Sequence, residues 1–152
     1  MRIEQRLEEL GLKAAPARVN PNRVGAVKHG DLVYLSGKTP VYSDGKPRQK
    51  GKIGSDLTLE EGYEGARQTA VNLLGALKDC IGDLDQVTQV VKLLCMVNTA
   101  DGFYEAHKVA DGASDLLVEL YGEKGMHARS AVGIACPGGN NMIEIEMIVA
   151  VE

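Results

Sequence analysis

The amino-acid sequence predicts an α+β fold in which two helices cover one face of a mixed β-sheet. Two observations support this class. Short runs with strand character and two long amphipathic runs follow one another in the order β-β-α-β-α-β-β. The length of 152 residues suits one domain with a single hydrophobic core. We therefore expect an N-terminal helical extension over residues 1–20 and one domain over residues 21–152.

The first third of the chain predicts a short helix, two strands and a long loop. The helix has apolar residues on one face, namely Ile3, Leu7 and Leu10. Residues 24–37 have the alternation of two strands, and the turn composition at residues 29–31 separates them. Residues 38–56 are rich in Gly, Pro and Lys, so they predict a surface loop. Its basic residues are interpreted as solvated, with anion binding as the minority alternative.

Two amphipathic helices flank one buried strand in the middle of the chain. Thr58 and Glu61 have the spacing of a capping box, so the first long helix begins there. The apolar, β-branched run over residues 86–99 predicts a central strand that is buried on both faces for much of its length. Residues 101–121 have the apolar spacing of a second helix, which ends at Gly122.

The last part of the chain predicts a hairpin of residues 128–135 and 143–151. The second strand has one continuous apolar face, made of Ile143, Ile145, Met147, Val149 and Val151. Glu144 therefore lies on the opposite face, and hairpin pairing would put Arg129 on that same uncovered face, beside small residues. Four or more positions along a strand separate the two charges by about 13 Å or more, so within one chain they need not meet.

Two interpretations of these charges remain open. A rigid guanidinium fork on a floor of small side chains suits a small carboxylate ligand. A solvated sheet face, or ion pairs between subunits, would account for the same charges without a ligand.

Composition and the remaining motifs exclude several classes of function. A net charge of −4 gives no basic surface for nucleic acid. A signal peptide and a membrane-spanning run are not found, so a cytoplasmic protein is expected. Cys80, Cys95 and Cys136 match neither a disulfide framework nor a zinc site, and we interpret them as reduced packing residues. His107 is expected on a solvated helix face. His127 directly precedes the predicted hairpin, where it is either an ordinary histidine at a helix-to-strand corner or a residue that borders a cleft, and no cluster has metal-ligand spacing.

The segments "LVYLSGKTP", "ARSAVG" and "IEIEMIVAV", with the order of elements, resemble the RidA/YjgF family of imine deaminases, also labelled L-PSP endoribonuclease-like. The resemblance covers about residues 22–152. It implies a chorismate-mutase-like fold, a homotrimer and sites in the clefts between subunits. It also implies hydrolysis of 2-imino or 2-enamino acids to 2-keto acids and ammonia, with no cofactor, because the pyridoxal phosphate belongs to the upstream enzyme.

The resemblance also implies roles for individual residues. By position, Arg129 matches the residue that binds the substrate carboxylate, and Glu144 matches the residue that acts on the hydrolytic water. Ser36 and Gly37 match the turn that lines the cleft.

Three positions depart from the family pattern. Arg23 stands where a Tyr is usual, Asp111 where an Asn is usual, and Ala131 where a Cys is frequent. Arg23 and Asp111 are therefore candidate substrate-binding residues that change the charge of the site. The alternative function is a non-catalytic trimer that binds a small keto acid. Ribonuclease activity is disfavoured, because the chain is acidic and has no row of aromatic residues on which bases could stack.

Overall fold

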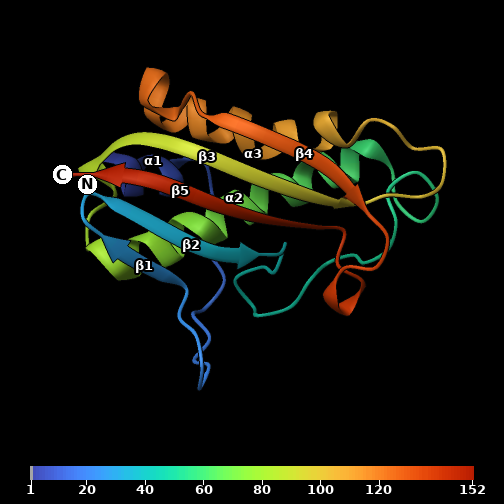
Figure 1. Ribbon diagram of the computed structural model, residues 1–152, viewed down its shortest axis with the longest axis horizontal. Helices are drawn as coiled ribbons and strands as arrows, with labels where there is room; N and C mark the ends of the chain where they lie inside the picture. Colours follow the sequence, from blue (N-terminus) through green and yellow to red (C-terminus); the bar gives the residue numbers. More distant parts are fainter. Residues whose placement is uncertain (1) are drawn as a thin grey trace.

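The computed structural model describes residues 2–152 and confirms the α+β class, with five strands in one mixed sheet (Figure 1). In sheet order the strands are β1 (Ala26–His29), β2 (Leu32–Lys38), β5 (Ile143–Val151), β3 (Val87–Asn98) and β4 (Ala128–Ile134). All neighbours are antiparallel except β3 and β4, which run parallel. The C-terminal strand β5 therefore lies in the middle of the sheet.

The two long helices, α2 (Leu59–Ile81) and α3 (Ala106–Tyr121), pack on the same face of the sheet and lie behind it in Figure 1. The core between the layers contains fully buried residues of both helices and of β3 and β5, among them Leu73, Leu117, Leu93, Ile145 and Met147. No helix of residues 2–152 covers the other face of the sheet, and we call it the open face.

The ends of the helices follow local sequence signals. The capping box is present as predicted, since the Glu61 N–H donates to Thr58 Oγ1 and the Thr58 N–H donates to the Glu61 carboxylate. Helix α3 ends at Gly122 as predicted, but it begins at Ala106 rather than near residue 101. Gly102 has a φ of +80°, which a right-handed helix does not tolerate, so the chain turns there before the helix starts.

Strands β4 and β5 do not form the predicted hairpin, because β3 lies between them. Leu93 of β3 pairs with Arg129 on one side and with Met147 on the other. Residues paired across a sheet share a face, so Arg129 lies on the helix-covered face. The prediction that Arg129 and Glu144 share the uncovered face is wrong: helix α3 makes β3 and β4 a parallel pair, and the chain then crosses to the other side of β3.

The apolar alternation of β5 was interpreted correctly. Its odd-numbered residues are buried in the core, and Glu144 and Glu146 lie on the open face. Glu144 pairs across the sheet with Met96 of β3, which pairs in turn with Val132 of β4. Arg129 and Glu144 are therefore on opposite faces, with one strand between theirs.

The N-terminal helix α1 (Arg2–Glu9) packs against a short 3-10 turn, η1 (Leu84–Gln86), and against α3. Ile3 is 8% exposed and belongs to the core, and the N–H groups of Arg2 and Ile3 donate to the carboxylate of Asp85. Two further 3-10 turns, η2 (Gly122–Gly125) and η3 (Gly138–Asn140), precede β4 and β5. Across residues 2–152, every helix is too short or too polar to cross a bilayer.

The interpretation of the cysteines is correct for one residue of three. Cys95 is buried on β3, and burial raises the pKa of its thiol to about 11, so it stays neutral. Cys80 and Cys136 are exposed, at the end of α2 and in the loop after β4, and they are not packing residues.

Candidate functional site

The residues predicted for the site form two groups on opposite faces of the sheet. Ser36, Gly37 and Glu144 lie together on the open face and form the glutamate group. Arg129 and Asp111 lie together between β4 and α3 and form the arginine group. Within one chain the two groups do not meet.

The glutamate group is built on a bulge in β2. Leu35 pairs with Met147 and Lys38 pairs with Ile145, so Ser36 and Gly37 together face a single position of β5. The Ser36 N–H donates to the carbonyl of Gly25 at 2.9 Å, and its hydroxyl donates to the carbonyl of Val24 at 2.7 Å. These two bonds fix the bulge to the segment before β1.

Gly37 lies directly against the side chain of Glu144. A Cβ atom at Gly37 would be 2.9 Å from Cγ and Cδ of Glu144, closer than real side chains approach. The absence of a side chain at Gly37 therefore lets the Glu144 carboxyl group rest on the bulge. Arg23 is exposed one residue before Val24, so it lies near this group, but its guanidinium donates to its neighbour Asn22.

The arginine group is a network between β4 and α3. Nη1 of Arg129 donates to Asp111 Oδ1 at 2.8 Å and to Ser114 Oγ at 3.0 Å, and Nη2 donates to the carbonyl of His107 at 3.2 Å. These three α3 residues are spaced by four and three positions, so they lie on one helical face. The Arg129 side chain is 21% exposed. A guanidinium has five N–H donors, and the three used here leave two for a ligand.

Asp111 changes the electrostatics around Arg129. The carboxylate pairs with the guanidinium and is itself 48% exposed, so it lies at the outer edge of the group. An anionic ligand must therefore approach Arg129 past a negative charge, and water screens that charge only in part. Ser114 was missed by the sequence analysis, and its place three residues after Asp111 was the only signal available.

A pocket of about 500 Å³ lies beside the arginine group. Its floor is Ala131, Gly133 and Ala135 on β4, and its wall is the loop that carries Phe103 and leads to His107. The small side chains of β4 thus leave free volume beside His107, whose carbonyl contacts Arg129, and this volume is enough for a small organic acid.

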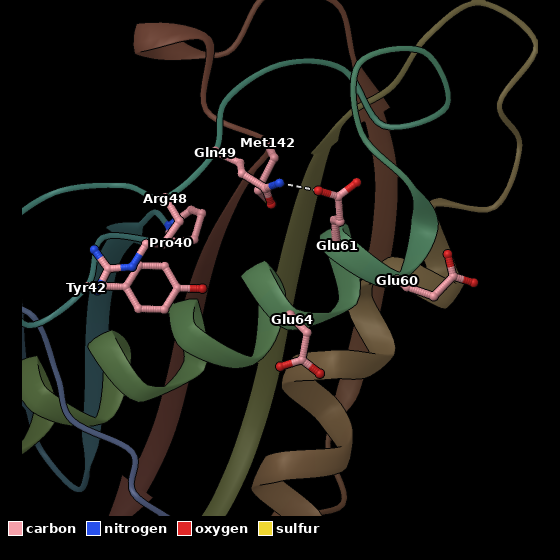
Figure 2. Close-up of a pocket in the computed structure, with 8 residues that line it drawn as sticks. All are labelled: Pro40, Tyr42, Arg48, Gln49, Glu60, Glu61, Glu64 and Met142. Carbon is pink, nitrogen blue, oxygen red and sulfur yellow. Dashed lines mark hydrogen bonds between the residues drawn. The ribbon is translucent and has the colours of Figure 1, made fainter.

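A second pocket, of about 310 Å³, lies between α2 and the loop after β2, and Figure 2 shows the residues that line it. Glu60, Glu61 and Glu64 come from the first turns of α2, and Glu61 accepts a hydrogen bond from Gln49. The only cation in this lining is Arg48. Its guanidinium carbon lies 4.5 Å from the centre of the Tyr42 ring, and the guanidinium pairs with Asp44. Three carboxylates against one guanidinium make this pocket unsuitable for an anion.

The histidines differ in their surroundings. The His107 side chain is exposed, as predicted, and only its carbonyl takes part in the arginine group. Both ring nitrogens of His127 have partners, Nε2 with Ser114 Oγ at 2.9 Å and Nδ1 with the carbonyl of Gly125 at 2.7 Å. His127 is thus linked to Arg129 through Ser114.

One cluster of carboxylates lies away from both groups. Oxygen atoms of Glu4, Asp83 and Asp85 are within 4.8 Å of one another. Glu4 accepts the N–H of Leu84, and Asp85 accepts two N–H groups at the start of α1, so the cluster fastens α1 to the domain.

Comparison with known proteins places the chain among relatives of known fold. The model of the family described as "YjgF/chorismate mutase-like, putative endoribonuclease" matches residues 6–143. Protein TCP17 of Trypanosoma cruzi is 38% identical over 153 residues, which cover 97% of this chain and 93% of TCP17.

Solved structures show the same fold. Protein Atu1372 of Agrobacterium tumefaciens, described as having unknown function, is 39% identical with a TM-score of 0.90, over 98% of this chain and 91% of that one. A Shewanella oneidensis protein described as "a putative endoribonuclease" is 30% identical with a TM-score of 0.92, over 98% of this chain and 99% of that one. Escherichia coli TdcF, solved with bound serine, is 19% identical with a TM-score of 0.63, over 91% of this chain and 94% of that one. That likeness shows the fold alone.

Proposed function

The chain belongs to the YjgF/chorismate mutase-like family, as the resemblance predicted, and on this premise we propose that it hydrolyses reactive 2-imino and 2-enamino acids to 2-keto acids and ammonia. The observation that carries the proposal is the division of the candidate residues into two groups. Arg129 offers donors for a carboxylate on one face, and Glu144 offers a base for a water molecule on the other. Each group is one half of a site.

A homotrimer would join the two halves. The open face exposes large apolar side chains, with Val27 53%, Tyr34 46% and Val132 43% exposed, so it is suited to a partner surface. In a closed ring of three identical chains, one surface of each chain contacts a different surface of the next chain. The glutamate group of one chain would then face the arginine group of the next, and each cleft would hold one complete site.

The proposed chemistry needs only water and these side chains. Arg129 holds the substrate carboxylate, and Glu144 accepts a proton from a water molecule that attacks the imine carbon. A carbon–oxygen bond forms, and the electron pair of the C=N bond moves to nitrogen. Glu144 returns this proton to nitrogen, which gives a carbinolamine with a hydroxyl and an amino group on one carbon; an enamino acid reaches the same intermediate through its imine tautomer. The hydroxyl proton then passes to the amino nitrogen through Glu144, the carbon–oxygen double bond forms, the carbon–nitrogen bond breaks, and ammonia leaves a 2-keto acid. The serine bound to TdcF is, like this substrate, a small carboxylate with nitrogen on the adjacent carbon.

One observation favours the second candidate, a keto-acid-binding trimer without catalysis. Asp111 pairs with Arg129, which weakens the attraction for an anion and suits reversible binding more than tight orientation of a substrate.

Purified protein mixed with 2-aminoacrylate generated in situ separates the two candidates. The enzyme is expected to accelerate imine loss above the uncatalysed rate, and Arg129→Ala is expected to remove that acceleration. Sedimentation of both proteins serves as the control for assembly. Saturable binding of 2-oxobutyrate with no acceleration would establish the binder instead, and a stable monomer at micromolar concentration would contradict the shared site.

A Gly37→Ala variant is expected to lose about tenfold or more of the deaminase rate while the fold is kept. The new methyl group displaces the Glu144 carboxyl group, which is the flexible end of a side chain, and the φ of Gly37 is one that alanine accepts. Gly138→Ala is the matched control, because nothing lies within 4 Å of its added Cβ. Rates and melting temperatures of both variants test this, and an unchanged rate in Gly37→Ala would show that the position of Glu144 does not matter.

A further inference from the structure

A chain of hydrogen bonds runs from Arg129 away from the pocket. Arg129 Nη1 donates to Ser114 Oγ, Ser114 Oγ contacts Nε2 of His127 at 2.9 Å, and Nδ1 of His127 contacts the carbonyl of Gly125 at 2.7 Å. This chain connects β4, α3 and the turn η2. The proposed reaction uses neither Ser114 nor His127, so a separate explanation is needed for their contact with the arginine group.

The donor and the acceptor of each hydrogen bond in this series can be assigned. A carbonyl oxygen only accepts, so Nδ1 of His127 carries a proton and donates it to Gly125. In a neutral imidazole Nε2 is then an acceptor, so the Ser114 hydroxyl donates to it. The oxygen of Ser114 is thereby oriented to accept from Arg129. Neutral His127 thus orients the Ser114 oxygen, which accepts the hydrogen bond from Nη1 of Arg129.

The surroundings keep His127 neutral. Burial lowers the pKa of His127, the positive charge of Arg129 lowers it further, and the bond to Gly125 opposes both effects. The elements packed around it carry further titratable or charged groups, namely His107, Lys108, Asp111, Asp115 and Glu119 on α3, Glu123 and Lys124 on η2, and Lys92 and Cys95 on β3. Asp115 and Glu119 are paired with residues of α2, and Lys108 is paired with Glu105.

We propose that Ser114 and His127 are positioning residues, which hold the Arg129 guanidinium in its place against α3 while His127 is neutral and loosen it when His127 becomes protonated. A protonated imidazole donates from both nitrogens, so the Ser114 hydroxyl loses its acceptor. Its oxygen would then have to accept from two cations at once. Repulsion between those cations weakens the bond to Arg129. The functional part of this inference rests on the proposed function, because it takes Arg129 as the ligand anchor.

The direction of the pH dependence follows from the sign of the shift. Because folding lowers the pKa of His127, its stabilising contribution is complete above the unfolded value of about 6.5. That contribution is lost as the pH falls through the folded value. Mild acid should therefore loosen Arg129.

The first test needs no ligand. Hydrogen exchange at Nε–H of Arg129 is measured by NMR in nitrogen-15-labelled protein between about pH 7.5 and pH 5.5. The intrinsic exchange rate of a free guanidinium falls toward acid pH. The quantity compared between proteins and pH values is therefore the protection factor, which is the intrinsic rate divided by the measured rate. In the parent, protection is expected to fall about three- to tenfold on acidification. In His127→Gln, which keeps an acceptor for Ser114 but does not titrate, it is expected to stay constant. His29→Gln is the matched control, since it removes an exposed imidazole on β1, at the edge of the sheet opposite β4.

The second test measures binding of 2-oxobutyrate, whose carboxylate stays ionised over this range. The parent and His29→Gln are expected to lose about three- to tenfold in affinity on acidification, whereas His127→Gln should not change. Ser114→Ala is expected to show the weakened affinity at every pH. Protection that falls equally in the parent and in His127→Gln would overturn the positioning role. If protection behaves as expected but 2-oxobutyrate does not bind, the positioning role stands and the proposed function fails.

Discussion

An Arg129→Lys variant is expected to bind 2-oxobutyrate roughly tenfold or more weakly than the parent protein. The guanidinium has five N–H donors in one rigid plane. Three of them bind Asp111, Ser114 and the carbonyl of His107, so two remain for a ligand. A lysine ammonium has three donors at one point, so it cannot keep these contacts and also hold a carboxylate bidentately. Titration of both proteins with 2-oxobutyrate measures the difference.

The control for this prediction is Asp111→Asn. It keeps the fork of Arg129 but removes the competing carboxylate, so it is expected to bind 2-oxobutyrate at least as tightly as the parent, most clearly at low salt. Sedimentation shows whether either substitution alters assembly. Arg129→Lys binding as tightly as the parent would contradict the anchor role, and weaker binding by Asp111→Asn would assign the carboxylate a direct part in holding the ligand.

Local sequence signals predicted the elements of this fold well. The capping box at Thr58 and Glu61 is a contact between residues three apart, so the sequence contains both partners. The buried face of β5 likewise follows from alternation within one strand. Such features depend only on neighbours in the chain.

The pairing of β4 could not be obtained in the same way. Alternation shows that a strand has two faces, but it does not show which strand lies next to it. The short segment before β5 favoured a hairpin, whereas β4 forms its bonds with β3, more than thirty residues earlier in the chain. This one choice decides which face carries Arg129, so the residues of the candidate site were identified while their arrangement was not.

The positioning residues and the bulge were also beyond sequence reasoning. Serine on a helix is common, and the relation of Ser114 to Arg129 exists only after α3 packs on β4. Gly37 follows a serine at the end of a strand, which suggests only that the strand stops there. In the structure the strand continues to Lys38, and Gly37 instead makes room for Glu144.

The opposite faces of Arg129 and Glu144 make the assembly part of the proposed chemistry. A hairpin would have placed both charges on one surface, where a single chain might bind a ligand alone. With β3 between their strands and the sheet between their side chains, the two groups do not meet within one chain, so the proposed site needs a neighbouring chain. Dissociation of the proposed trimer is therefore expected to abolish the proposed turnover, even though each chain keeps its own core.

A Glu144→Gln variant is expected to have the largest effect on catalysis, with a loss of about a hundredfold or more in the enzymatic rate of 2-aminoacrylate hydrolysis. Glutamine has the shape of glutamate, so it can still rest against Gly37, but its amide cannot accept a proton from water and return it to nitrogen. Affinity for 2-oxobutyrate is expected to change little, because the carboxylate is held by Arg129 of the arginine group. Steady-state rates and a 2-oxobutyrate titration measure the two effects separately.

Glu146→Gln is the matched control for this prediction, since it removes a carboxylate from the same open face of the same strand, two residues away. Glu146 is exposed and is the β5 position opposite the bulge, but the three atoms nearest to a Cβ at Gly37 all belong to Glu144. Its rate is expected to equal that of the parent. Equal losses in the two variants would mean that the negative charge of the open face, not a base at Glu144, supports the reaction. A full rate in Glu144→Gln would remove Glu144 from the mechanism and would require another base in the cleft.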